Sequence, residues 1–147
     1  MSTQNVQVTV SISNTPEAVI AFVSDIRNRA KYLQSLKSVS DIQGEPGEVG
    51  ATWRWIWDLL DHEFEGTGRC TDFQAGRRYA FVTEGGIASQ FSYQAEPQGE
   101  GTNLTIDVDF EVPAALLAGQ EGLDGLLAIA KQRGQEAVQG LKQMLEQ

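Results

Sequence analysis

Cysteine and histidine, on which most zinc sites, disulfides and nucleophilic centres depend, are almost absent from this sequence. Among its 147 residues there is one cysteine, Cys70, and one histidine, His62. A lone cysteine excludes a disulfide within the chain, and one residue of each kind without ligand spacing does not form a zinc site. The glycines also lack the spacing of a nucleotide-binding loop. We therefore predict neither a metal site nor a cofactor.

Positive charge is scarce as well. The net charge is −9, and the segment from Tyr79 to Ala130 holds eight acidic residues but neither lysine nor arginine. Nucleic acids and anionic lipid surfaces are bound through local positive charge, so we expect no nucleic-acid partner. Four basic residues do lie close together, and we interpret them as a solvated helix face. They are Arg27, Arg29, Lys31 and Lys37.

A third absence is a long apolar segment. No part of the sequence approaches the roughly 20 apolar residues that span a bilayer. The first ten residues, MSTQNVQVTV, have neither the basic stretch nor the apolar run of a secretory signal. We therefore expect no stable membrane insertion and a cytoplasmic location, which suits a chain without disulfides.

The composition is otherwise that of a globular protein. Hydrophobic residues make up 41% and charged residues 21% of the chain. A chain of this length builds one hydrophobic core of useful size. We predict a single domain over residues 1–147.

Hydrophobic periodicity predicts the first elements. Residues 6–12 alternate between apolar and polar side chains, which is typical of a strand with one buried face. Residues 14–17, Asn-Thr-Pro-Glu, supply a capping side chain, a proline for the first turn and an early acid, so a helix is expected over Pro16–Ser24. Residues 25–33 are expected to form a second short helix.

Strands dominate the middle of the chain. From Leu36 to Val112 we expect six strands separated by glycine- and proline-containing turns, which makes seven with the first. No crossover helices intervene, so the sheet is expected to be antiparallel, with consecutive strands joined as a meander.

A long amphipathic helix is expected at the C-terminal end. Its apolar positions are Leu123, Leu126, Leu127, Ala130, Gly134, Ala137, Val138, Leu141 and Leu145. Such a stripe must pack on a large apolar surface, and the sheet is the one that the pattern supplies.

Local motifs in this order resemble a known superfamily. They are residues 14–19 leading to 22–25, Val49-Gly50-Ala51 before a strand, Gly101-Thr102 opening the last strand, and residues 141–146. Together they resemble the START-like (SRPBCC) superfamily of START domains, birch-pollen-allergen-like proteins, polyketide cyclases and dehydratases, and coenzyme Q-binding proteins. The resemblance implies an α+β helix-grip fold: a curved seven-stranded antiparallel sheet, two short helices after the first strand, and a long C-terminal helix over the concave face, enclosing an apolar cavity. Fold alone does not select among the functions.

All three tryptophans of the chain are expected on one face of one strand. They alternate with Arg54 and Ile56. If residues 58–63 form the hairpin connection, two of the indoles lie opposite glycines, which leave room for the rings. The expected cross-strand pairs are Trp57–Phe64, Trp55–Gly66 and Trp53–Gly68.

Strand alternation and the helix stripe give a set of candidate ligand-binding residues. Core packing explains an aromatic stripe more often than a ligand site does, but the resemblance favours a cavity between helix and sheet. The candidates are Trp53, Trp55, Trp57, Phe64, Tyr79, Phe81, Phe91, Tyr93, Ile106, Val108, Phe110, Leu126, Ala130 and Arg133.

The polar candidates are Tyr79, Tyr93 and Arg133, followed by Asp72. A tyrosine hydroxyl can orient a ligand oxygen or bond to a backbone group. Arg133 can cap an anionic head at the mouth of a cavity or extend into solvent. Cys70 and Asp72 share a parity that Phe73 does not, which indicates a bulge.

No catalytic residue is predicted. We assign His62 to the surface near a hairpin tip, and residues 107, 109 and 111 to a solvated acidic face on the outside of the last strand.

The leading hypothesis is a protein that binds or carries a small hydrophobic molecule of aromatic or isoprenoid type. A first alternative is a cyclase- or dehydratase-like enzyme in which Tyr79, Tyr93 or Asp72 handles a proton. A second is an interaction module that docks on a protein partner or forms a homodimer.

Overall fold

The order of elements follows the predicted order throughout the described residues. The structure, a computed structural model, describes residues 3–33, 36–45, 47–59, 62–112 and 122–146. Its elements are β1 (Thr3–Ile12), α1 (Pro16–Ser24), a 3-10 turn η1 (Ile26–Asn28), α2 (Arg29–Tyr32), β2 (Leu36–Gln43), β3 (Thr52–Leu59), β4 (His62–Gln74), β5 (Arg78–Gly85), β6 (Ser89–Gln98), β7 (Gly101–Glu111) and α4 (Gly122–Leu145).

The helix α1 has the ends that its sequence predicts. The Thr15 hydroxyl accepts a hydrogen bond from the backbone N–H of Ala18 at 3.2 Å, and Pro16 occupies the first turn. After Ser24 the backbone becomes extended at Asp25, whose carboxylate accepts from the N–H of Arg27 and so caps η1. The expected second helix is thus divided into η1 and the four-residue α2.

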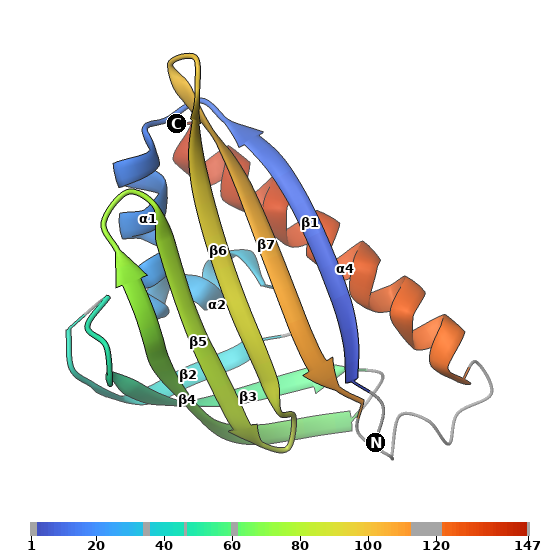
Figure 1. The fold of residues 1–147 in the computed structure, drawn as a ribbon. Helices are drawn as coiled ribbons and strands as arrows, with labels where there is room; N and C mark the ends of the chain where they lie inside the picture. The colour runs from blue at the N-terminus through green and yellow to red at the C-terminus, as the bar shows by residue number, and fades with distance from the viewer. Residues whose placement is uncertain (1–2, 34–35, 46, 60–61, 113–121, 147) are drawn as a thin grey trace.

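One antiparallel sheet holds all seven strands. Its order is β1-β7-β6-β5-β4-β3-β2, so β2 to β7 form a meander and β1 returns to pair with β7. The sheet is strongly curved: along its strand order the direction turns until β2 and β3 run across the direction of β6, β7 and β1 (Figure 1). The predicted seven-stranded helix-grip fold is confirmed.

Two hairpins are tighter than expected. Pairing of β3 with β4 continues through Asp58–Glu63 to Leu59–His62, inside the segment that we assigned to the connection. Likewise β6 extends through Pro97 and Gln98, since both pair with residues of β7.

The aromatic row of β3 has the predicted register. Trp53, Trp55 and Trp57 lie opposite Gly68, Gly66 and Phe64. A Cβ atom added to Gly66 would lie 2.7 Å from Trp55 Cζ2, closer than any ordinary contact, so the indole needs a glycine there. The expected bulge in β4 is also present, as a register shift between Cys70 and Asp72.

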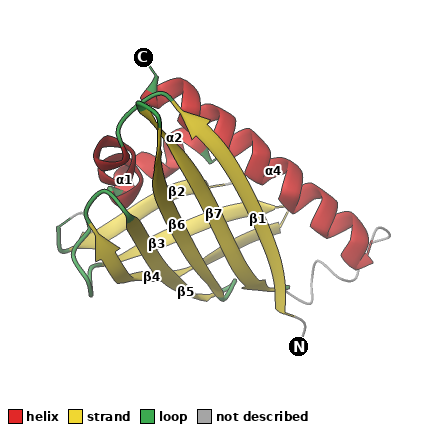
Figure 2. Ribbon diagram, turned by 45° about the horizontal axis from the view of Figure 1, so that its top comes forward, coloured by secondary structure: helices red, strands yellow, loops and turns green. Residues whose placement is uncertain are grey.

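The long helix α4 lies on the concave side of the sheet and closes the interior (Figure 2). It approaches β1 closely at Gly134, where an added Cβ would lie 3.3 Å from Val8 Cγ1. Nearer its end, the fully buried Leu141 joins the core. None of the helices in the described part of the chain is long and apolar enough to cross a membrane.

Candidate ligand-binding cavity

A cavity of about 170 Å³ lies between α4, α2 and the concave face of the sheet. An apolar cavity of about 150 Å³ is enough to hold a benzene molecule. This space is therefore of the size that takes one aromatic ring with a short side chain.

Nine of the fourteen candidate residues line this cavity. They are Trp55, Trp57, Phe91, Tyr93, Ile106, Val108, Phe110, Ala130 and Arg133. They come from β3, β6, β7 and α4, so side chains far apart in the sequence meet around one space.

Four further candidates lie elsewhere. Trp53 and Tyr79 line a second pocket of about 250 Å³, whose wall also carries the charged side chains of Asp25, Arg27 and Glu45.

Phe81 is buried with its ring centroid 5.3 Å from that of Trp53. Phe64 is partly buried against the core, where an added Cβ at Gly86 would lie 3.0 Å from its own Cβ. The last candidate, Leu126, belongs to α4, but its side chain lies outside the described part of the structure.

The aromatic wall is held in place by specific contacts. The indole Nε1 of Trp55 donates to the backbone carbonyl of Thr67 at 3.0 Å, which fixes the ring over Gly66. Phe91 stacks on Phe81 with ring centroids 4.7 Å apart and planes inclined by 11°. These contacts between protein groups hold the rings of the wall in place.

Two tyrosines of the cavity lining bring their hydroxyl groups together. Tyr32 and Tyr93 are both buried, with their oxygens 3.3 Å apart. Burial raises the pKa of Tyr32 well above that of a free phenol, so its hydroxyl keeps its proton near neutral pH. One hydroxyl donates to the other, which leaves the pair one O–H that can donate to another group.

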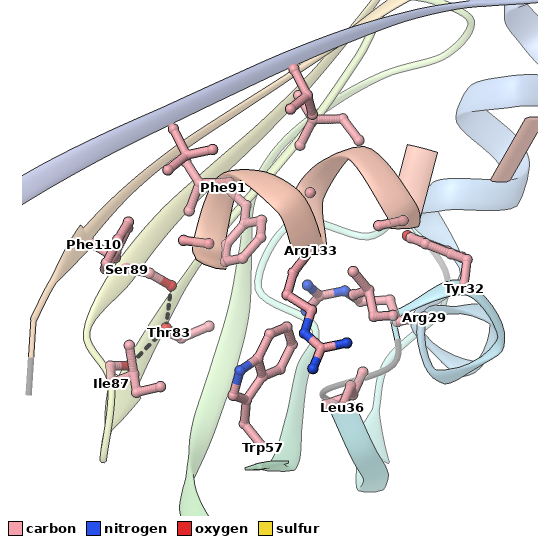
Figure 3. Close-up of a pocket in the computed structure, with 18 of the residues that line it drawn as sticks. Arg29, Tyr32, Leu36, Trp57, Thr83, Ile87, Ser89, Phe91, Phe110 and Arg133 are labelled. Atoms are coloured by element: carbon pink, nitrogen blue, oxygen red, sulfur yellow. Dashed lines mark hydrogen bonds between the residues drawn. The ribbon is translucent and has the colours of Figure 1, made fainter. Parts of the chain in front are cut away.

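The other two hydroxyl groups on the wall are already engaged. Thr83 donates to the carbonyl of Ile87 at 2.9 Å, so Ser89 must be the donor in the short hydrogen bond between Ser89 and Thr83. Figure 3 shows both bonds at the edge of the cavity. Neither proton is available to a ligand.

Arg29, which the sequence interpretation placed on a solvated face, is buried in the cavity wall. Its side chain is only 3% exposed, and its guanidinium carbon lies 4.6 Å from the ring centroid of Phe81 and 4.8 Å from that of Phe91. Within the described residues, neither Nε nor Nη2 has a hydrogen-bond partner. Cation–π contacts stabilise the charge, but an unpaired buried donor still costs about 1–3 kcal/mol, and more when it is charged.

The sequence does contain a signal for the burial of Arg29, namely a spacing of three positions between buried residues. Ile26 and Tyr32 are both buried, and Arg29 lies midway between them on the same side of the segment. The other bases are exposed, as expected, but Lys37 lies on β2 and not on a helix. Arg27 pairs with Asp25 at 2.8 Å, and Lys37 with Glu63 at 2.9 Å.

Arg133 enters the cavity from α4. Its side chain is 46% exposed, and Nη1 lies 3.7 Å from the carboxylate of Glu136 on the next turn. Figure 3 shows the guanidinium groups of Arg29 and Arg133 directed into the same cavity from opposite elements. Asp, Glu, His and Cys are absent from the described residues that line it.

The remaining polar candidates lie away from this cavity. Asp72 forms an ion pair with Arg78 at 2.8 Å, and both side chains are at least partly exposed. Burial raises the pKa of the Cys70 thiol, because the thiolate would lose its hydration. Across the described ranges there is no group of three side chains suited to bind a metal ion.

The fold and the cavity define the class of this protein: a START-like helix-grip protein with an apolar, aromatic-lined interior. A family model, described as polyketide cyclase / dehydrase and lipid transport, matches residues 3–146. The chain belongs to this family. No curated protein gives a significant sequence match.

Solved structures share the fold at low sequence identity. The protein TTHA0849 from Thermus thermophilus is 18% identical with a TM-score of 0.80, and 97% of each chain is covered. The Zhui aromatase/cyclase from Streptomyces sp. R1128 is 19% identical with a TM-score of 0.77, over 99% of this chain and 94% of that one. Ara h 8.0201 is 15% identical with a TM-score of 0.68, and 98% of each chain is covered.

Proposed function

We propose that the protein binds or carries a small hydrophobic molecule in the cavity between α4 and the sheet. The observation that carries this proposal is the cavity itself, about 170 Å³ in volume, with a wall built mainly from aromatic and aliphatic side chains. Such pockets hold a ligand by apolar burial and orient it with a few polar groups. The family description, which includes lipid transport, agrees with this role.

The first alternative, a cyclase- or dehydratase-like enzyme, is favoured by the Tyr32–Tyr93 hydroxyl pair and by the fold shared with an aromatase/cyclase. Proton abstraction from a substrate also needs a base within reach. The described lining offers phenols, arginines and engaged hydroxyls, none of which is a base near neutral pH. Binding therefore accounts for this cavity better than catalysis does.

The second alternative, docking on a protein partner or a second copy, requires an exposed apolar surface. Among the described residues, the large apolar side chains that are most exposed are Ile42 and Val49, at 40% and 60% exposure. Two such side chains are normal for a surface, so a cavity ligand remains the better proposal, in a protein that we expect to act in the cytoplasm.

Titration of the full chain with 3-phenylpropanamide tests the proposal. This uncharged probe has one aromatic ring and does not absorb where tryptophan does. Binding should change the tryptophan emission saturably, because Trp55 and Trp57 line the cavity. Folded wild-type protein that shows no saturable change, with either this amide or the matching carboxylate, would contradict the proposal.

Two alanines of α4 provide matched variants. Ala130 lines the cavity, whereas Ala128 is exposed on the same helix. Ala130→Phe places a ring in the space that the probe needs and should weaken binding about tenfold or more. Ala128→Phe should bind as the wild type does. Equal loss in both variants would show that the effect arises outside the cavity.

A further inference from the structure

Among the described residues, the cavity lining carries charged hydrogen-bond donors but no charged acceptor. Arg29 belongs to that lining, and no acceptor for its buried Nε and Nη2 is found within the described residues. The Tyr32–Tyr93 pair presents one phenolic proton. Because both tyrosines and Arg29 line the same space, one ligand head can reach donors from α2 and from β6.

The charge of the cavity has one sign. The described lining contains the guanidinium groups of Arg29 and Arg133 but no carboxylate. Glu136, the acid 3.7 Å from Arg133, is not part of that lining. A negative group placed between α2 and α4 would therefore meet the buried guanidinium of Arg29, where electrostatic attraction is strong, and approach the half-exposed guanidinium of Arg133.

Aromatic rings support the position of the Arg29 guanidinium. Its guanidinium carbon lies over the rings of Phe81 and Phe91, which stack on one another. A ring face attracts the charge but is a poor substitute for an oxygen acceptor, so the N–H groups remain available. The guanidinium fork matches two oxygens of one group better than any other side chain does.

We propose that the ligand is a small amphipathic carboxylate, with an apolar body of about one aromatic ring and its carboxylate oxygens bound by Arg29 and the Tyr32–Tyr93 pair. This inference rests on the proposed function and narrows it to one ligand class. The carboxylate supplies the acceptors that Arg29 lacks, and the aromatic wall takes the apolar body.

A pair of probes that differ in the head group alone tests the inference. In wild type, 3-phenylpropanoate should bind about tenfold or more tightly than 3-phenylpropanamide, the usual size of a charge-assisted hydrogen bond over a neutral one. If the amide binds at least as tightly as the acid, the carboxylate assignment is wrong while the proposed cavity function stands. If neither binds, both fail together.

Two substitutions locate the preference. Arg29→Met removes the charge and keeps the inner part of the apolar stem, so the ratio of acid affinity to amide affinity should fall to about one. Arg27→Met removes the same charge two residues away, on an exposed side chain paired with Asp25. It should keep the preference. If Arg29→Met still prefers the acid over the amide, a group other than Arg29 binds the carboxylate and the assignment is wrong.

A spectroscopic readout keeps the test independent of the stability of the Met variant. In ¹⁵N-labelled protein the Nε–H resonance of Arg29, identified by its loss in Arg29→Lys, should shift when 3-phenylpropanoate is added and not when the amide is. Arg29→Lys should also bind the acid several-fold more weakly, because an ammonium group cannot present two parallel donors. An Nε–H resonance unaffected by saturating acid would contradict direct contact.

Discussion

Two neighbouring indoles of β3 meet different surroundings, although they share one face of one strand. Trp55 is 5% exposed, covers Gly66 and donates to the Thr67 carbonyl, whereas Trp57 is only partly buried at the cavity. The alternation of side chains places both rings inward, but contacts with β4 decide how much each ring contributes to stability.

Alanine substitutions should separate these contributions. Trp55→Ala should lower the free energy of unfolding by about 3–5 kcal/mol, since it removes a buried ring and Gly66 has no side chain to fill the space that the ring leaves. Trp57→Ala should cost clearly less, because the ring is partly exposed and faces open space. Chemical denaturation of both variants checks this. Equal losses would mean that Trp57 also belongs to the rigid core.

Residue-scale patterns also show what the sequence can predict. The pairs Trp55–Gly66 and Trp53–Gly68 were predictable, because a slip of one residue would turn every indole outward. The burial of Arg29 was not predicted, because η1 and α2 span only seven residues and cannot establish a helical period. The spacing of Ile26, Arg29 and Tyr32 was present in the sequence, but a basic residue there is ordinarily solvated.

At the scale of elements, α4 closes the interior through two different contacts. Its middle turns contribute Ala130, Arg133, Gly134 and Ala137 to the cavity, and Gly134 also brings it against β1. Its last turns place Leu141 and Leu145 in the core. The amphipathic pattern predicted the helix and its apolar side. It could not reveal which turns pack tightly and which leave a space, because that depends on the curvature of the sheet.

A pair of substitutions in the second half measures how firmly α4 is anchored. Leu141 is fully buried, so Leu141→Ala should lower the free energy of unfolding by about 2–5 kcal/mol. Gln143→Ala, two residues on and exposed, should change it by less than about 0.5 kcal/mol. Denaturant unfolding followed by circular dichroism gives both values. A small loss in Leu141→Ala would show that the sheet is stable without this end of α4.

At the scale of the whole molecule, the charge outside contrasts with the charge inside. The chain carries a net charge of −9, yet the cavity lining includes two arginines and, within the described residues, no acid. The exterior charge was evident from composition, whereas the interior charge depends on how α2 and α4 face one another.

The acidic exterior predicts weak association with polyanions. At low salt, the protein at micromolar concentration should bind neither duplex DNA nor vesicles containing anionic lipid, because its net negative charge repels both polyanions. Sedimentation with vesicles and fluorescence anisotropy with labelled DNA check this. Micromolar binding that weakens steeply with added salt would instead point to the basic segment of residues 27–37.

The short α2 and the sheet make separable contributions to ligand choice. Ring stacking and strand pairing in β3, β5 and β6 determine how large a molecule fits, whereas the buried charge is carried by a helix of four residues. Substitution of Arg29, in the segment of residues 25–33, can therefore change which head group is accepted while the cavity wall formed by the sheet stays the same. The head-group specificity of such a protein can therefore change during evolution through few substitutions. Among related chains with the same cavity, we expect the residues of this segment to vary more than those of the sheet.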